Sequence, residues 1–318
     1  MIELRQIGEQ VWSRTVMLGG EAHVATYLVG GDGWALIDTG VKFPPGDPRS
    51  LSRSALARIP GFDDLDHIVL THGHYDHVGG VAALAAEYPA AQIYLHPADR
   101  RMASSAIVQS EEMAAFAKAW NLPEKAASME AHINERMTGV HPEYDLADGM
   151  RIDLGGGALI EVIALPGHTA GSVAFRLAAE DITFVGDAVQ GWGSRTGSWP
   201  FYADPTSYRD SLKRLASYGP QRLAMAHGYH CGLPFNSAVL GASDVLAALE
   251  LSVSVVDAIE REVLKGQPGR PALEMAREVV HALLDEIPAR TEPTTGLPNH
   301  AGMALWAHGL RSSTTPHQ

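Results

Sequence analysis

Four side chains that can bind a metal ion lie within six residues, in the segment Thr71-His72-Gly73-His74-Tyr75-Asp76-His77-Val78-Gly79-Gly80. Alternate side chains of an extended loop point the same way, so His72 and His74 can reach one ion. Asp76 and His77 follow where the chain turns, and they can be directed at a second ion. Imidazole with carboxylate suits zinc, iron, manganese or nickel better than calcium or magnesium. A surface loop that is rich in histidine by chance is the alternative, and it explains this spacing poorly.

A strand and a helix must position this loop. The apolar segment Asp66-His67-Ile68-Val69-Leu70 is typical of a buried strand, and the Ala-rich segment from Val81 to Glu87 is typical of a helix. The loop therefore lies at the carboxyl edge of a sheet, where α/β proteins tend to place their sites.

Two motifs resemble those of a known family. The pattern T-H-x-H-x-D-H-x-G-G at residues 71–80 is similar to the signature of the metallo-β-lactamase fold hydrolases, which include glyoxalase II, acyl-homoserine lactonases and several thioesterases. The segment Pro166-Gly167-His168-Thr169-Ala170-Gly171-Ser172 resembles the family's third motif. The resemblance implies an α/β fold, a four-layer αββα metallo-β-lactamase sandwich, here with a helical insertion and C-terminal helices.

The resemblance also implies seven metal ligands, each on the loop after an expected strand. One ion would be bound by His72, His74 and His168. A second ion would be bound by Asp76, His77 and His227. Asp187, which follows the apolar strand Ile182–Val185, would bridge the two ions.

Asp38 lies in Asp38-Thr39-Gly40, at the end of an expected strand. In the resembled family this aspartate lies beside the metal ligands, and a metal-bound histidine commonly donates its free N–H to such a carboxylate. An aspartate that only bonds turn amides is the alternative, and the two roles are compatible.

The implied chemistry is hydrolysis. Two cations about 3.5–4 Å apart hold a bridging hydroxide, because binding lowers the pKa of water from ~15.7 to ~7. One ion also polarises a carbonyl oxygen and stabilises the oxyanion. Asp76 is the expected catalytic residue, because it can relay a proton while remaining a ligand. We expect a dinuclear-metal hydrolase of a thioester (acyl-CoA or glutathione thioester) or a lactone. Its cofactors would be two divalent ions per chain, zinc foremost, with iron or manganese as alternatives.

Two other functions share the motif. One is a mononuclear iron sulfur dioxygenase, which bound-metal identity and oxygen uptake would distinguish. The other is a metal-binding regulatory effector with little turnover.

Candidate substrate contacts lie in three loops. His23 precedes the strand at residues 25–29 and is either a substrate contact or a solvated loop residue. The Gly- and aromatic-rich loop after Asp187 is expected to form a pocket wall through Trp192, Trp199, Phe201 and Tyr202. Arg195 in the same loop is either a contact to an anionic group of the substrate or a solvated residue. Tyr229 and His230 adjoin His227 and are expected to orient substrate.

Helical segments interrupt and follow the strand pattern. Residues 98–138 contain three, Ala98–Gln109, Glu111–Trp120 and Glu124–Met137, which we expect to form a lid, with a hairpin packed on the outside as the alternative. We expect a catalytic domain at residues 1–237. A C-terminal extension at 238–318, with helices at 238–265 and 271–287, would pack on the same domain. Shorter elements are expected too: strands at Gln10–Trp12 and Thr15–Met17 and a helix at Ser50–Arg58.

The composition of the chain disfavours some classes of binding partner. Lys and Arg number 24 against 37 Asp and Glu, a net charge of −13 that disfavours nucleic acid. No apolar run approaches ~18 residues, and the N-terminus lacks a signal-peptide pattern, so we expect no membrane association and a cytoplasmic location. The single cysteine, Cys231, permits no intramolecular disulfide. The expected partner is a small-molecule substrate, and the Ala-rich C-terminal helices are compatible with a homodimer.

Overall fold

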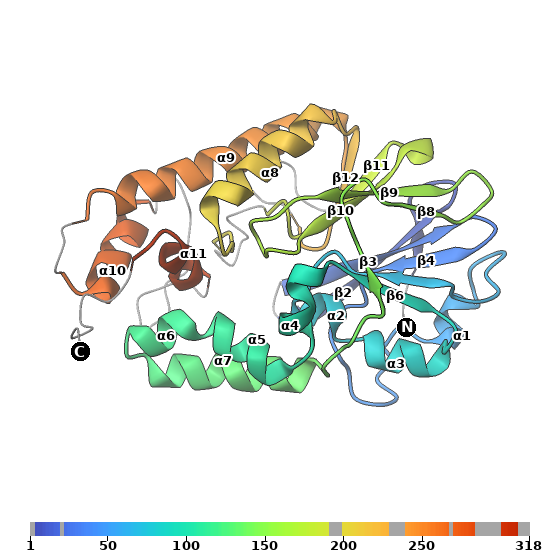
Figure 1. Cartoon of the computed structure of the whole chain (residues 1–318), viewed down its shortest axis with the longest axis horizontal. Coiled ribbons are helices and arrows are strands. Elements are labelled where there is room, and N and C mark those ends of the chain that lie inside the picture. Colours follow the sequence, from blue (N-terminus) through green and yellow to red (C-terminus); the bar gives the residue numbers. More distant parts are fainter. Residues whose placement is uncertain are drawn as a thin grey trace.

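A computed structural model describes residues 4–19, 22–190, 199–228, 239–266, 270–283 and 300–310. Two β-sheets pack face to face, and helices cover their outer faces (Figure 1). The layer between the sheets is apolar: the rings of Tyr27, from the first sheet, and Phe184, from the second, lie 5.0 Å apart between centroids. The αββα sandwich expected from the sequence is confirmed.

The first sheet contains seven strands in sequence order: β1 (Arg5–Gln6), β2 (Val11–Gly19), β3 (Ala22–Gly30), β4 (Trp34–Ile37), β5 (His67–Val69), β6 (Gln92–Leu95) and β7 (Tyr144–Asp145). Strands β1 to β4 form an antiparallel meander, and β4 to β7 are parallel. The two short strands expected at 10–17 were wrong, because β2 is continuous. Polar Arg14 interrupts the apolar pattern, yet it is buried and donates to the carbonyl of Arg49.

The second sheet has the order β13-β12-β11-β10-β9-β8. Its strands are β8 (Arg151–Asp153), β9 (Leu159–Ala164), β10 (Val173–Leu177), β11 (Ile182–Gly186), β12 (Arg222–Met225) and β13 (Val239–Leu240). Strand β13 lies where a helix from residue 238 was expected, and that boundary was wrong. Val239 and Leu240 pair with β12, so the sheet extends to residue 240 and the helix starts at Ala242.

Helices flank both sheets. Those beside the first sheet are α1 (Arg53–Leu56), α2 (Tyr75–Val78) and α3 (Val81–Glu87), and α1 is shorter than expected. The second sheet is covered by α8 (Pro205–Ser217) and α9 (Ala242–Val263), followed by α10 (Ala272–Ala282) and α11 (Ala301–Ala307). Asp204 caps the N-terminus of helix α8, because its side chain accepts hydrogen bonds from the amides of Thr206 and Ser207.

The insertion forms five short helices rather than three: η1 (Pro97–Asp99), α4 (Arg100–Ala103), α5 (Ala106–Met113), α6 (Ala115–Ala119) and α7 (Pro123–Arg136). Ser105 starts α5 by accepting from two amides, and Asn121, at a φ of 57°, separates α6 from α7. Helix α6 packs on α11, where Gly302 leaves room for the ring of Phe116. The insertion and the C-terminal helices therefore meet beside the sandwich (Figure 1).

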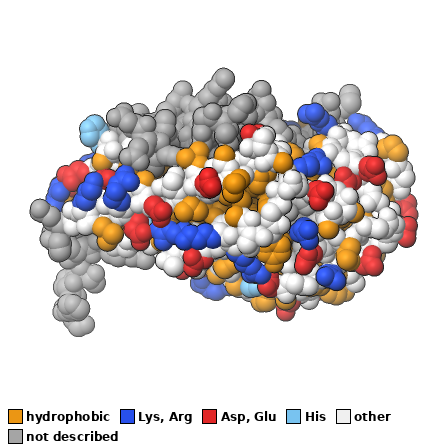
Figure 2. All heavy atoms as spheres, turned by 90° about the horizontal axis from the view of Figure 1, so that it is seen from above, with side chains coloured by type: hydrophobic (Ala, Val, Ile, Leu, Met, Phe, Trp, Pro, Cys, Tyr) orange, Lys and Arg blue, Asp and Glu red, His pale blue; other side chains and the backbone are white. Residues whose placement is uncertain are grey.

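The described surface carries charges of both signs. Lys and Arg alternate with Asp and Glu over the face shown in Figure 2. Among the described residues, no helix is both long enough and apolar enough to cross a bilayer.

Candidate metal centre

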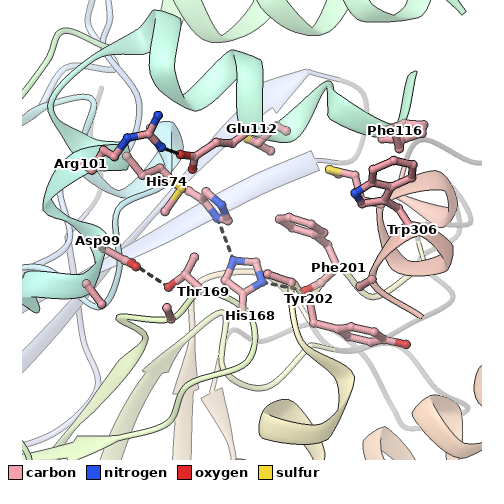
Figure 3. Close-up of a pocket in the computed structure, with 17 residues that line it drawn as sticks. His74, Asp99, Arg101, Glu112, Phe116, His168, Thr169, Phe201, Tyr202 and Trp306 are labelled. Carbon is pink, nitrogen blue, oxygen red and sulfur yellow. Dashed lines mark hydrogen bonds and ion pairs between the residues drawn. The ribbon is translucent and has the colours of Figure 1, made fainter. Parts of the chain in front are cut away.

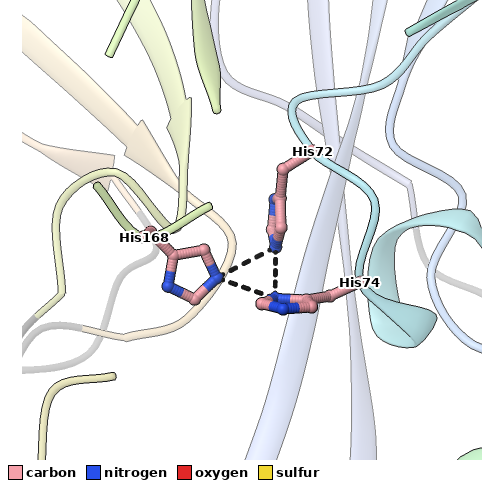
Figure 4. Close-up of side chains that lie close together, drawn as sticks. All are labelled: His72, His74 and His168. Atoms are coloured by element: carbon pink, nitrogen blue, oxygen red, sulfur yellow. Dashed lines mark hydrogen bonds between the residues drawn. The ribbon is translucent and has the colours of Figure 1, made fainter. Parts of the chain in front are cut away.

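The rings of His72, His74 and His168 point toward one another (Figure 4). The Nε2 of His72 lies 2.9 Å from Nδ1 of His74 and 3.1 Å from Nε2 of His168, and the third edge of the triangle is 2.8 Å. Zinc–nitrogen bonds of about 2.0–2.1 Å in a tetrahedral site place ligand atoms about 3.3 Å apart. This group, the three-histidine cluster, therefore has close to the spacing that a single ion requires.

A second group, the Asp76 cluster, contains Asp76, His77 and His227. The Nε2 of His227 lies 3.2 Å from Oδ2 of Asp76, and Nε2 of His77 lies 3.9 Å from Oδ1 of Asp76. Helix α2 explains part of this arrangement, because it starts immediately after His74 and turns Asp76 and His77 away from the extended loop.

Asp187 lies between the two clusters, immediately after β11. Its Oδ2 is 3.5 Å from Nε2 of His168 in the three-histidine cluster. Its Oδ1 is 3.3 Å from Nε2 of His77 and 3.5 Å from Nε2 of His227 in the Asp76 cluster. One carboxylate thus presents one oxygen to each cluster, which is the arrangement of a bridging ligand.

Two buried atoms of the centre, Nε2 of His77 and Oδ1 of Asp187, face each other at 3.3 Å but form no well-aligned hydrogen bond among the described residues. Buried polar groups are normally paired, because leaving one unpaired costs roughly 1–3 kcal/mol. A divalent ion would satisfy both atoms at once. The donor set of imidazole and carboxylate fits zinc, iron or manganese, so these residues fit the metal pair expected from the sequence.

The outer ring nitrogens of three histidines are held by acceptors. Nδ1 of His77 donates to Oδ2 of Asp38 at 2.8 Å, and Nδ1 of His168 donates to the carbonyl of Phe201 at 2.7 Å. Nδ1 of His227 donates to the carbonyl of His23 at 2.5 Å. These bonds fix each ring so that Nε2 faces the centre, as is usual for metal-binding histidines.

The two clusters differ in charge. Burial lowers the pKa of His72, His74 and His168, so the three-histidine cluster is neutral near pH 7. Burial also acts to lower the pKa of His227, but the carboxylates of Asp187 and Asp76 outweigh it and raise the pKa to about 9. Burial likewise acts to lower the pKa of His77. The neighbouring carboxylates, Asp38 foremost, outweigh burial and raise this pKa well above its ordinary value.

This difference predicts proton release on metal binding. His77 and His227 carry a proton in the metal-free chain at pH 7, and a metal ligand must lose it. Filling the Asp76 cluster should therefore release about two protons at pH 7, and fewer above pH 9, where His227 is already neutral. Calorimetric titration in buffers of different ionisation enthalpy measures this number. A net release near zero at pH 7 would contradict the assigned charges, and His77→Ala, which removes one of the protons, should lower the release.

Asp38 links the strand β4 to the metal loop. Its Oδ2 accepts from Oγ1 of Thr71 at 2.7 Å as well as from His77, and its Oδ1 accepts from the amide of Thr71 at 2.8 Å. Its backbone has a φ of 58°, which is unfavourable for a residue other than glycine. Such a conformation persists where the surroundings enforce it, often at functional sites.

We expect Asp38→Asn to weaken metal binding by about 10–100-fold with little loss of fold. The amide keeps the shape of the side chain but removes the charge that orients His77 and favours its N–H donor. Competition with a chromophoric chelator measures the change. An unaltered affinity would mean that Asp38 only bonds the turn amides, and exposed Asp32→Asn, in the turn before β4, is the matched control.

Asp99, in the insertion, was not identified from the sequence. Although buried, it accepts from the amides of Gly73 at 2.9 Å and Gly171 at 2.8 Å, and from Oγ1 of Thr169 at 2.7 Å. A Cβ at Gly171 would lie 2.6 Å from the Asp99 carboxyl carbon, which explains the glycine. Asp99 therefore joins the loops that carry His72, His74 and His168.

Two glutamines were also missed. Buried Gln109, on α5, donates to the carbonyl of Gly73 at 2.8 Å and accepts from the amide of Tyr75 at 2.7 Å. Gln190 donates to Oδ2 of Asp187 at 3.2 Å and accepts from the amide of Phe201. Neither glutamine belongs to a sequence pattern that would have identified it.

A cavity of about 400 Å³ opens beside His74 and His168 (Figure 3). It is lined by the metal loops, by α4 to α6 of the insertion, by residues 201–203 and by α11. Of the expected contacts, Phe201 and Tyr202 line it, although the Tyr202 hydroxyl is bonded to His308 at 2.9 Å.

The other expected contacts have different outcomes. Trp199 does not line this cavity: it is buried in the core cluster that also contains residues of α8 and α9. His23 does not line this cavity: its Nε2 accepts from the amide of Gly228, beside His227. Outside the described residues lie Trp192, Arg195, Tyr229 and His230.

The sequence matches the family model of the metallo-beta-lactamase superfamily over residues 18–227, a range that contains all seven residues of the centre. The chain belongs to this superfamily, as its motifs indicated.

Curated relatives include a hydroxyacylglutathione hydrolase from Aeromonas hydrophila, 32% identical over 187 residues, which are 58% of this chain and 55% of that protein. A lactamase-like protein from Penicillium aethiopicum is 29% identical over 208 residues, 64% of this chain and 50% of that protein. The chain thus spans about half the length of the curated relatives it matches.

Solved structures show the same fold. A metallo-beta-lactamase family protein from Thermus thermophilus superposes with a TM-score of 0.67 at 22% identity, covering 94% of this chain and 91% of that one. The metallo-beta-lactamase FIM-1 from Pseudomonas aeruginosa, in its mono-zinc form, has a TM-score of 0.54 at 20% identity, covering 80% and 95%.

Proposed function

We propose that the chain is a metal-dependent hydrolase that uses two divalent ions, zinc foremost. Its substrate would be a thioester or a lactone, cleaved at the bond between the acyl carbon and the sulfur or ring oxygen. The observation that carries the proposal is Asp187, whose two oxygens face two separate clusters of metal-binding side chains. Several relatives are hydroxyacylglutathione hydrolases, which supports a thioester substrate.

Ions held by these residues would supply a water of lowered pKa and an electrophile for the carbonyl oxygen. The chain's own residues would position the ions and balance their charge. Asp187 and Asp76 supply the two carboxylates that balance the ions. The histidine rings are fixed by their outer hydrogen bonds, so little reorganisation is needed when substrate binds.

Asp76 is the residue that would move the proton. Burial raises its pKa, but the neighbouring His77 and His227 outweigh burial and keep the pKa below its ordinary value. Its carboxylate is therefore ionised at pH 7 and can accept the proton of the attacking water. It would then return that proton to the leaving thiolate or alkoxide, so that the water adds across the cleaved bond.

Turnover assays on metal-loaded protein test the proposal. The panel contains acyl-CoA thioesters, S-lactoylglutathione and lactones, with oxygen uptake recorded in parallel. We expect hydrolysis of one ester class without oxygen consumption. Oxygen consumption with a single bound iron would instead identify a dioxygenase, and metal binding with no turnover on any substrate would favour a regulatory effector.

A further inference from the structure

We propose that the cavity beside His74 and His168 is an acyl pocket, which binds a medium-chain or aromatic acyl group between the insertion and helix α11. This inference rests on the proposed function and names the part of the substrate that is recognised. Because the cavity adjoins two residues of the three-histidine cluster, a ligand lying in it would place its carbonyl at the metal centre.

The apolar wall lies on one side of the centre. Figure 3 places Phe116, Phe201 and Trp306 on the same side of the His74–His168 pair. Met102, Met113 and Met303 also line the cavity. Methionine side chains are flexible and polarizable, so they adapt to apolar groups of different shape.

The polar lining groups already have partners within the protein. Asp99 accepts from three donors of the metal loops, and Thr169 donates one of those bonds. The Tyr202 hydroxyl is bonded to His308. Since these groups have no need of a ligand, a polar chain such as a peptide or sugar would lose its own hydrogen bonds to water on entering.

The remaining charges lie on the opposite side of the centre. Arg101 and Glu112 form an ion pair there, and both side chains are exposed to solvent. Within the described part of the chain, the apolar side of the cavity thus presents no charged group of its own. An aliphatic or aryl group is therefore the ligand that gains most from burial there.

The cavity volume bounds the size of the acyl group. At about 30 Å³ for each water-sized group, 400 Å³ holds on the order of a dozen non-hydrogen atoms. An octanoyl or a substituted benzoyl group fits this bound, whereas an acetyl group would leave most of the wall uncovered.

The test compares S-acyl-N-acetylcysteamine thioesters from acetyl to decanoyl, which share one small leaving group. We expect kcat/KM to rise with chain length to about octanoyl. Ala307→Leu places three further carbons in the cavity and should lower the octanoyl-to-acetyl ratio of kcat/KM by about tenfold or more. Ala282→Leu, at an exposed alanine of α10 that does not line the cavity, should leave the ratio unchanged.

Two further measurements separate the pocket from the reaction. Met113→Ala enlarges the cavity and should move the optimum to longer chains, which covers the case that Ala307→Leu fails to fold. Binding of 1-octanol to the metal-free protein should change tryptophan fluorescence, and Trp306→Phe should remove that change.

The outcomes are distinguishable. Turnover with a flat chain-length profile and no octanol signal at Trp306 would overturn the acyl pocket and leave the hydrolase intact. Octanol binding with no turnover on any thioester or lactone would overturn the proposed function and support an apolar ligand in this cavity.

Discussion

Replacing Asp187 with alanine is expected to lower the metal content below two ions per chain and to abolish hydrolysis. Its two oxygens lie 3.3 to 3.5 Å from ring nitrogens in both clusters, so the substitution removes a carboxylate oxygen that faces each of them. The loss in kcat/KM should exceed the roughly 10–100-fold change typical of residues that only orient a ligand. Elemental analysis of purified protein and steady-state kinetics measure the two effects.

The matched control is Asp210→Ala, which removes an exposed aspartate from α8 without approaching the centre. It should retain both ions and full turnover. If Asp187→Ala retained two ions and remained active, the bridging assignment would be wrong and Asp187 would be a core residue that happens to face the histidines.

Replacing Asp99 with alanine is expected to destabilise the fold and the three-histidine cluster together. The substitution leaves two buried amides, those of Gly73 and Gly171, and the Thr169 hydroxyl without their acceptor. Charge-assisted bonds are worth about 1.5–3 kcal/mol each and unpaired buried donors cost about 1–3 kcal/mol, so we expect a loss of about 3–5 kcal/mol in the free energy of unfolding. Denaturant unfolding of the metal-free protein measures it.

Asp145→Ala is the control for Asp99. Asp145 also belongs to a well-formed carboxylate interaction, with Arg100 at 2.7 Å, but it is exposed. Its removal should cost less than about 1 kcal/mol, as for surface ion pairs in general. Equal losses for the two variants would show that Asp99 does not join the metal loops in solution.

The local motifs predicted which loops bring metal-type side chains together. Five metal-type residues of the centre lie within the two segments 71–80 and 166–172, and the remaining Asp187 and His227 follow apolar strands. Each follows the end of a strand: β5 in the first sheet and β9, β11 and β12 in the second. Polar residues that follow strand ends in α/β proteins tend to form the site. For this reason the positions of the strands and the spacing of the motifs predict that side chains far apart in sequence lie close together. The largest separation, from His72 to His227, is 155 positions.

The supporting residues were not predictable in this way. Asp99, Gln109 and Gln190 each hydrogen-bond groups of the metal loops or of the loops beside them, and their own segments have no distinctive composition. Trp199 was placed in the pocket because aromatic residues near a site often contact substrate. Its burial depends on how α8 and α9 cover the second sheet, which is a tertiary property.

The insertion has a second role that its sequence did not suggest. Its helices were expected to form a lid, and α4 to α6 do line the cavity. Asp99 and Gln109 also bond the backbone of the metal loop at Gly73. Removing the insertion is therefore expected to weaken metal binding as well as to alter substrate preference.

Anomalous X-ray scattering from crystals of the zinc-loaded protein tests the dinuclear centre most directly. The predicted result is two peaks per chain, one within ligand distance of the three-histidine cluster and one within ligand distance of the Asp76 cluster, with an oxygen of Asp187 directed at each. A single peak at the three histidines, with Asp187 contacting no ion at saturating zinc, would contradict the two-metal assignment.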